Sequence, residues 1–395
     1  MIDKIKNLSA LYLNETIAYR RHIHQHPELS FLEVNTVKYI SGELNKIGIN
    51  YSCNIATTGI VGMIEGKNPA KKVVMLRADM DALPITEKND LPYTSKNMGV
   101  MHACGHDAHS ATLLTVAKIL FELKNEFEGT IKLIFQPGEE KFPGGASLMI
   151  KEGVLENPTV DVALGNHVFP ELETGHVGFR RGIYMASADE VRITVKGKGG
   201  HGAMPHTLID PIAIAAQVIV SLQQLISRKS NPAMPSVLSF GKIEGNGTTN
   251  VIPDEVTMEG TFRTFDEEWR KKAHQFIHDI AYHTAKGYGG EAEIKIDIGY
   301  PVLKNEENLT QRCKLAAIEY LGENRVHDLP IRMTAEDFSY YSQKVDACFY
   351  RFGTGNKTIN TNFPVHTSLF NIDENSLETS VGLMAYLALE NLKVG

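Results

Sequence analysis

The densest group of reactive side chains in the sequence lies between residues 102 and 109. It reads His-Ala-Cys-Gly-His-Asp-Ala-His, so three histidines, one cysteine and one aspartate fall within eight positions. Thiolate, imidazole and carboxylate groups are the protein ligands of borderline divalent metals. The group directly precedes an apolar helical pattern, and a helix N-terminus favours the thiolate form of Cys104. The pattern indicates a metal site. The alternatives are a polar helix cap around a buried thiol, and a thiol enzyme with Cys104 as nucleophile and a histidine base.

Two adjacent carboxylates, Glu139 and Glu140, form the second candidate group. They follow Gln136-Pro137-Gly138, a sharp turn after an apolar run, and we expect them to point in different directions. One could bind a metal while the other acts as general base on a metal-activated water. A thiol enzyme would leave this pair without a role, so the two groups together favour a metal site with a carboxylate base.

Several isolated histidines are weaker candidates. His167 follows a buried-type strand and His366 lies near the C-terminus, and a single histidine of this kind is more often structural than a ligand. His201 lies in a glycine-rich turn, where a histidine could donate a hydrogen bond to an oxyanion. His274 and His278 are four residues apart without an acidic partner, which predicts a solvated helix face.

Residues 1–180 alternate between strand and helix patterns. The predicted elements are strands over 72–77, 130–135 and 161–164 and a helix over 108–127. Strands separated by helices imply parallel pairing, and therefore an α/β sheet. Three apolar runs lead into ionisable residues, namely Asp79 and Asp81, Glu139 and Glu140, and His167. We expect them at one sheet edge, because ligands bind beyond the carboxyl ends of parallel strands.

The middle of the chain has a different order of elements. It predicts strand, helix, strand, strand, helix, strand over 190–196, 210–227, 236–243, 255–263, 266–286 and 291–298. This βαββαβ order is the ferredoxin-like arrangement, and the segment has the size of a small inserted domain. Afterwards, helices are predicted over 311–321, 336–344 and 376–393, and a strand over 347–352. The expected division is a catalytic domain of 1–186 and 299–395 around an inserted domain of 187–298.

Two tetrapeptides have the spacing of a capping box, in which a serine or threonine precedes a glutamate by three residues. They are Ser30-Phe31-Leu32-Glu33, ahead of a helix expected to end near Gly48, and Thr264-Phe265-Asp266-Glu267.

Composition narrows the class of protein. The 395 residues are 43% hydrophobic and 22% charged, an ordinary globular balance, and the length favours two domains. The formal net charge of -7 disfavours a nucleic-acid partner. We see neither an export signal nor a membrane span, and the four cysteines are too scattered for a disulfide framework. The expectation is a soluble protein of the reducing cytoplasm.

The chain resembles the metal-dependent amidohydrolases that include hippurate hydrolase, bacterial aminoacylases and plant indole-acetyl-amino-acid hydrolases, within the aminoacylase and carboxypeptidase superfamily. The matching stretches follow the family's order over nearly the whole chain. They are HPELSFLE (26–33), RADMDALPI (77–85), MHACGHDAH (101–109), FQPGEE (135–140), GNHV (165–168), GKGGHGAMPH (197–206), NVIPDE (250–255), GTFRTF (260–265), MTAEDF (333–338) and VHTSLFNIDE (365–374). In this family Gly138 is usually alanine, and we expect the glycine only to loosen the turn.

The resemblance implies a site of two divalent metals. Its ligands would be Cys104, His106, Glu140, His167 and His366. Glu139 would be the general base and acid, and Asp81 would orient a metal ligand. The role of Asp79 is open, because other branches of the superfamily have a ligand histidine there. Zinc or manganese is expected, and cobalt or nickel would suit the same residues.

The resemblance also assigns roles to the inserted domain, which would serve as a dimerisation and lid module of a homodimer. His201 would reach the partner subunit's active site and stabilise the oxyanion. Asn250 and Arg263 would bind substrate through its carboxylate. Glu336 is expected near the site, without an assigned role.

The predicted function is hydrolysis of the amide bond of N-acyl-L-amino acids. The alternative within enzymes is a dipeptidase or carboxypeptidase with the same metal site. A binding or scaffolding protein on a decayed hydrolase fold is disfavoured, because every predicted ligand and the base are present in the sequence.

Overall fold

The computed structural model describes residues 1–393, which divide into two compact units. The larger unit comprises Met1–Tyr184, Lys304–Ile331 and the chain from Asp337 onward. The smaller unit comprises Met185–Leu303 and the short return segment Arg332–Glu336. Two short strands, β7 (Gly182–Met185) and β14 (Leu303–Asn305), lie where the chain passes from one unit to the other. Among residues 1–393, none of the helices has the length and apolar character needed to cross a membrane.

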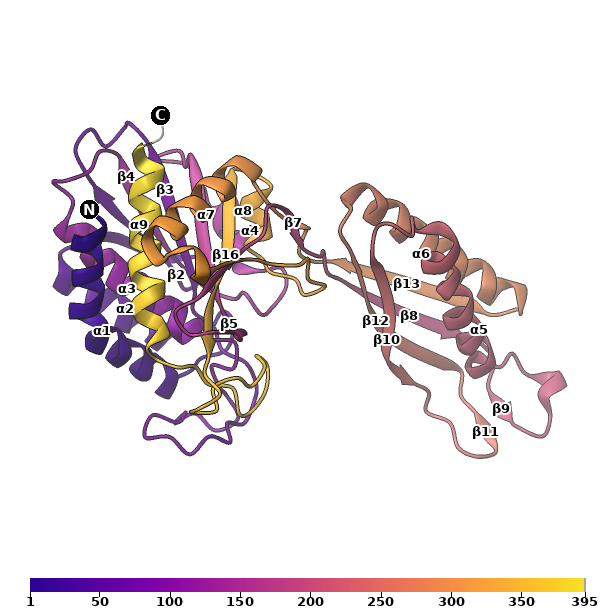
Figure 1. Cartoon of the computed structure of the whole chain (residues 1–395). Helices are drawn as coiled ribbons and strands as arrows, with labels where there is room; N and C mark the ends of the chain where they lie inside the picture. The colour runs from indigo at the N-terminus through magenta and orange to yellow at the C-terminus, as the bar shows by residue number, and fades with distance from the viewer. Residues whose placement is uncertain (394–395) are drawn as a thin grey trace. The chain divides into compact units, whose positions relative to one another are not determined.

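The larger unit is built on an eight-stranded, mostly parallel sheet (Figure 1). In spatial order its strands are β1 (Asn50–Ile55), β2 (Gly59–Glu65), β4 (Thr130–Gln136), β3 (Val73–Asp79), β5 (Val162–Glu173), β16 (Asp346–Gly355), β6 (Val177–Phe179) and β15 (Val326–Asp328). The four central strands β4, β3, β5 and β16 are parallel, and β1 and β2 pair antiparallel. Strand β6 pairs antiparallel with β16 and parallel with β15. Every residue of β3 and β4 is buried, as expected for parallel strands covered on both faces. The predicted α/β sheet is confirmed.

Helices cover this sheet and enclose its core. The helices α1 (Ile2–Gln25), α3 (His106–Glu122) and α9 (Ser376–Lys393) pack against one another, with α2 (Val34–Ile47) beside α3 (Figure 1). Further helices are α7 (Glu307–Leu321), which packs on β16, and the shorter α4 (Gly145–Lys151) and α8 (Ser339–Ser342). The helix predicted over 336–344 is thus a single short turn of helix.

The first capping-box prediction is wrong. Helix α2 begins at Val34, but its first free amides, Asn35 N and Thr36 N, donate to the carboxylate of Glu28. The Ser30 hydroxyl instead donates to Asp81, and Glu33 makes no side-chain cap for the helix. The helix ends, as predicted, at Gly48 with a left-handed φ of 91°.

The smaller unit is a four-stranded antiparallel sheet with two long helices. Its strand order is β10 (Ser236–Glu244), β12 (Glu255–Thr264), β8 (Asp189–Lys196) and β13 (Glu291–Ile298), and its helices are α5 (Pro211–Gln224) and α6 (Glu267–Gly287). This is the ferredoxin-like arrangement that the element order predicted. A two-stranded ribbon pairs β9 (Gly200–His201) with β11 (Val251–Ile252).

Two predictions for α6 need correction. Its N-cap is Asp266, whose carboxylate accepts from Glu268 N and Trp269 N, so the Thr264 box is not formed. His274 does not lie on a solvated face, because its Nε2 is 2.7 Å from the buried carboxylate of Asp189.

Candidate metal centre

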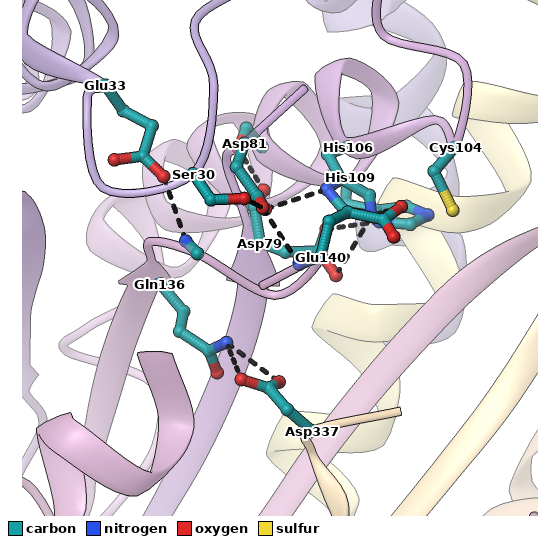
Figure 2. A network of polar contacts seen from close by, with 12 residues as sticks. Ser30, Glu33, Asp79, Asp81, Cys104, His106, His109, Gln136, Glu140 and Asp337 are labelled. Carbon is teal, nitrogen blue, oxygen red and sulfur yellow. Dashed lines mark hydrogen bonds and ion pairs between the residues drawn. The ribbon is translucent and has the colours of Figure 1, made fainter. Parts of the chain in front are cut away.

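The larger unit brings together all five side chains expected to bind metal. Potential ligand atoms of Cys104, His106 and His167 lie within 4.8 Å of one another, and so do those of Cys104, Glu140 and His366. Cys104 belongs to both groups, so the five residues form one cluster. Glu139 joins it through a third group with His106 and Glu140. Figure 2 shows Cys104, His106 and Glu140 gathered at this point.

The cluster is assembled from four parts of the chain. Cys104 and His106 stand at the start of α3, and Glu140 lies on the turn after β4. His167 lies inside β5, not at the end of that strand as the sequence suggested. The pairing of β3 with β5 stops at Arg77 and Gly165, so His167 lies two residues beyond the end of this pairing, level with the last residue of β3, Asp79. His366 comes from a loop, where its amide donates to Ala103 O at 2.7 Å and its φ is 63°.

The ligand atoms approach one another closely. Cys104 Sγ is 3.3 Å from His167 Nε2, and His366 Nε2 is 3.1 Å from Glu140 Oε1. Within residues 1–393, His106 Nε2 and Glu140 Oε1 are buried and make no hydrogen bond; the approach of His366 Nε2 to Glu140 Oε1 is close but lacks hydrogen-bond geometry. Buried polar atoms are normally satisfied, because leaving them unpaired costs free energy. A cation would satisfy both atoms, and the sulfur, nitrogen and oxygen donors suit a borderline divalent metal.

Asp81 orients two of these ligands. Its Oδ1 lies 3.1 Å from His106 Nδ1, and its Oδ2 accepts from Glu140 N at 2.9 Å and from the Ser30 hydroxyl at 2.6 Å (Figure 2). Burial acts to raise the pKa of Asp81, but the hydrogen bonds from His106 and Ser30 keep it below its usual value. The carboxylate is therefore ionised and holds the imidazole and the glutamate turn together.

The environment of Cys104 disfavours a thiol enzyme. Burial raises the pKa of the Cys104 thiol well above its usual value, and Glu140 and Glu139 raise it further. An uncomplexed thiolate nucleophile is therefore disfavoured here. A bound cation is the environment that would favour deprotonated sulfur.

A buried polar network behind the cluster was not predicted from the sequence. Asp79 Oδ1 is 2.6 Å from His109 Nδ1, and His109 Nε2 accepts from the amide of Val168 at 2.9 Å. Asp79 thus supports the strand next to His167, and His109 holds the backbone there. Potential ligand atoms of Asp79, His106 and His109 also lie within 4.8 Å of one another, so this network adjoins the cluster at His106. Figure 2 shows Asp79 and His109 beside His106.

Arg77 connects this network to a distant part of the chain. Its Nη1 donates to Asp79 at 2.6 Å and its Nη2 to Asp337 at 2.7 Å, and Gln136 Nε2 donates to both oxygens of Asp337. All four side chains are buried. In the sequence, the only indication of this network is an arginine and a glutamine at the ends of otherwise apolar runs. That pattern does not identify Asp79 or Asp337 as their partners.

The remaining predicted residues belong to the smaller unit. His201 and Asn250 are neighbours there, since Gly202 N donates to Asn250 O and His201 pairs with Val251. Arg263 lies on β12 and donates to Met333 O at 3.1 Å, and Glu336 closes the return segment. Their roles toward a substrate stay predictions.

The fold and the metal-ligand cluster define a metal-dependent hydrolase. The chain belongs to Peptidase family M20/M25/M40, which it matches over residues 75–390. An N-acyl-L-amino acid amidohydrolase of Geobacillus stearothermophilus is 44% identical over 77% of this chain and 82% of its own. Thermostable carboxypeptidase 1 of Saccharolobus solfataricus is 38% identical over 99% and 98% of the two chains. A dinuclear metal binding peptidase of the M20 family from Bacillus subtilis superposes with a TM-score of 0.84 at 34% identity, covering 98% and 99%. The chain is thus a hydrolase of amide bonds.

Proposed function

We propose that this protein hydrolyses the amide bond of N-acyl-L-amino acids with two divalent metal ions. The observation that carries the proposal is the single cluster of Cys104, His106, His167, Glu140 and His366, with Glu139 beside it. The relative named for N-acyl-L-amino acids is also the more similar of the two relatives above, at 44% against 38% identity.

Different residues of the chain have different roles in the proposed reaction. Two bound metals would polarise the amide carbonyl and lower the pKa of water. Glu139 accepts the proton of the attacking water and then delivers it to the leaving amine nitrogen. Asp81 keeps His106 and the Glu140 amide in place. Arg263 and Asn250 bind the substrate carboxylate, with Glu336 near the site.

The first experiment compares Glu139→Gln with the wild type on a small panel of N-acyl amino acids. We expect the variant to retain its metal and to lose about 10²–10⁴-fold in kcat, because only the proton carrier is removed. Glu140→Gln is the matched control and should lose metal. Wild-type turnover by Glu139→Gln would refute the assignment of the base.

The second candidate is a dipeptidase or carboxypeptidase, which the similarity to a relative named carboxypeptidase favours. Both activities would use the same residues, so substrate competition decides between them. N-acetyl and N-benzoyl amino acids should give a higher kcat/KM than dipeptides. Metal analysis of the purified protein should find about two ions per chain, zinc or manganese first, with cobalt or nickel as substitutes.

We further propose a cytoplasmic homodimer in which His201 of one subunit serves the other subunit's site. The four cysteines are all free, which suits a reducing compartment. Mixing a His201→Ala variant with a Glu139→Ala variant should restore part of the activity, because a heterodimer would contain one complete site. The absence of recovery after verified subunit exchange would argue against action between subunits.

A further inference from the structure

Glu33 is a buried carboxyl group that contacts the turn before the proposed base. Its Oε1 accepts from Gly138 N at 2.9 Å and from Phe31 N at 2.9 Å, and its Oε2 accepts from the Thr58 hydroxyl. The side chain is fully buried, at 0% exposure. In Figure 2 its carboxyl group points at a backbone nitrogen on the turn that leads to Glu140.

The backbone on both sides of Glu139 is held by buried carboxyl groups. Gly138 N donates to Glu33, and Glu140 N donates to Asp81 at 2.9 Å. Asp81 in turn accepts from Ser30, which lies three residues before Glu33. The segment 30–33 therefore supports both peptides that flank the base.

Phe31 packs on the same turn. Gly138 has a φ of 58°, and a Cβ at this position would lie 2.4 Å from Cζ of the Phe31 ring. The glycine therefore does more than loosen the turn, because its missing Cβ is the space that the ring occupies. Phe31 itself has a φ of 67°, a conformation uncommon for a bulky residue, and its amide is held by Glu33.

Glu33 is not needed to begin helix α2. The Glu28 carboxylate already accepts from the first free amides of that helix, Asn35 N and Thr36 N. Burial raises the pKa of Glu33 to about 7, which means that ionising this carboxyl group in the folded protein costs free energy. Capping of helix α2 does not explain why a carboxyl group is kept at this position. The contacts left to account for it are those with Gly138 N, Phe31 N and the Thr58 hydroxyl, and the first of these reaches the turn before Glu139.

We propose that Glu33 is a positioning residue, which fixes the Gly138 peptide and thereby holds Glu139 where proton transfer requires it. This inference rests on the proposed role of Glu139. A misplacement of about 1 Å at a reacting group can cost about 10²-fold in rate.

The test compares Glu33→Ala, Glu33→Gln and the matched control Glu28→Ala in the full-length, metal-loaded protein. The control weakens the same stretch of chain and the same helix start but leaves the turn untouched. Measured quantities are kcat and KM on an amide that the wild type hydrolyses, metal content, and hydrogen exchange of the peptide covering residues 136–141.

Glu33→Ala should lose about 10²-fold in kcat with little change in KM or metal content, and its turn should exchange faster. Glu33→Gln should recover most of the kcat, because the amide oxygen still accepts from Gly138 N and Phe31 N. Glu28→Ala should melt at a lower temperature and keep its kcat and its slow exchange at the turn.

Three results would overturn the inference. They are unchanged exchange and kcat in Glu33→Ala, a loss of metal that accounts for its activity, and an equal loss of kcat in Glu28→Ala. Failure of the proposed function can be distinguished from failure of this inference, because hydrogen exchange needs no substrate. A wild type that is inactive on every amide would refute the function. Hydrogen exchange at the turn would still decide whether Glu33 positions it.

Discussion

Oδ1 of Asp81 lies 3.1 Å from Nδ1 of His106, while Nε2 of the same ring is buried and, among residues 1–393, has no hydrogen-bond partner. The carboxylate thus selects which nitrogen carries the proton and which presents its lone pair to the cluster. The same carboxylate accepts from Glu140 N. One residue outside the proposed ligand set therefore contacts two proposed ligands.

Asp81→Ala should weaken metal binding by about 10–100-fold, because His106 loses its orienting partner and the Glu140 amide loses its acceptor. Competition with a chelator measures the affinity. The exposed Asp328, paired with Lys314, supplies a control in Asp328→Ala, which should bind metal as the wild type does. Unchanged affinity in Asp81→Ala would contradict an orienting role.

Arg77→Ala should lower the free energy of unfolding by about 3–5 kcal/mol, because it leaves the buried carboxylates of Asp79 and Asp337 without their shared cation. Urea unfolding measures the change. Arg192→Ala is the control, since that exposed pair with Glu259 should contribute about 0–1 kcal/mol. Similar values for the two variants would show that the buried network is not stabilising.

Glu33 should make stability depend on pH between its usual pKa and its pKa in the folded protein. Burial raises the pKa to about 7, the Thr58 hydrogen bond opposes this, and Asp81 adds to the rise. Between about pH 4.5 and about pH 7 the unfolded chain is ionised there while the folded chain keeps a proton. Folding then takes up a proton, so stability falls as pH rises through this window and is level above it.

The expected fall is about 3 kcal/mol, at about 1.4 kcal/mol per pKa unit. It is measured as the difference in unfolding free energy between the wild type and Glu33→Gln, which cannot titrate. A difference that stays constant from about pH 5 to about pH 8 would show that Glu33 is ionised throughout.

Gly138→Ala should lower kcat by about tenfold or more, because the new Cβ displaces the Phe31 ring and the φ of 58° suits alanine poorly. Combining it with Phe31→Ala removes the clash and should recover part of the loss. Steady-state kinetics of the wild type, both single variants and the double variant provide a double-mutant cycle. Strictly additive losses would mean that the two residues do not interact.

Much of the fold was predictable because it follows from local sequence patterns. Apolar runs identified β3, β4 and β5, and the element order of the middle segment identified the ferredoxin-like unit. The antiparallel edge strand β1 was missed because it is largely exposed and lacks an apolar run. The residue types of the metal cluster were also evident, since their chemistry does not depend on the fold.

The failure of the first capping-box prediction has a long-range cause. Ser30 and Glu33 have the spacing of a capping box, but Ser30 bonds Asp81, 51 residues away, and Glu33 bonds Gly138, 105 residues away. A tetrapeptide pattern indicates which local hydrogen bonds are available, but it cannot indicate a partner that the fold brings from a distant segment of the chain.

The sequence by itself therefore determined most of the elements, the ligand chemistry and the identity of the two glutamates after β4. Only the tertiary structure decided that Asp337 meets Arg77 across 260 residues, and that Glu33 supports the turn before Glu139. Periodicity tells which face of an element is buried. Which side chains meet on that face depends on the packing of distant segments, because buried polar groups take whichever partner the fold places within reach.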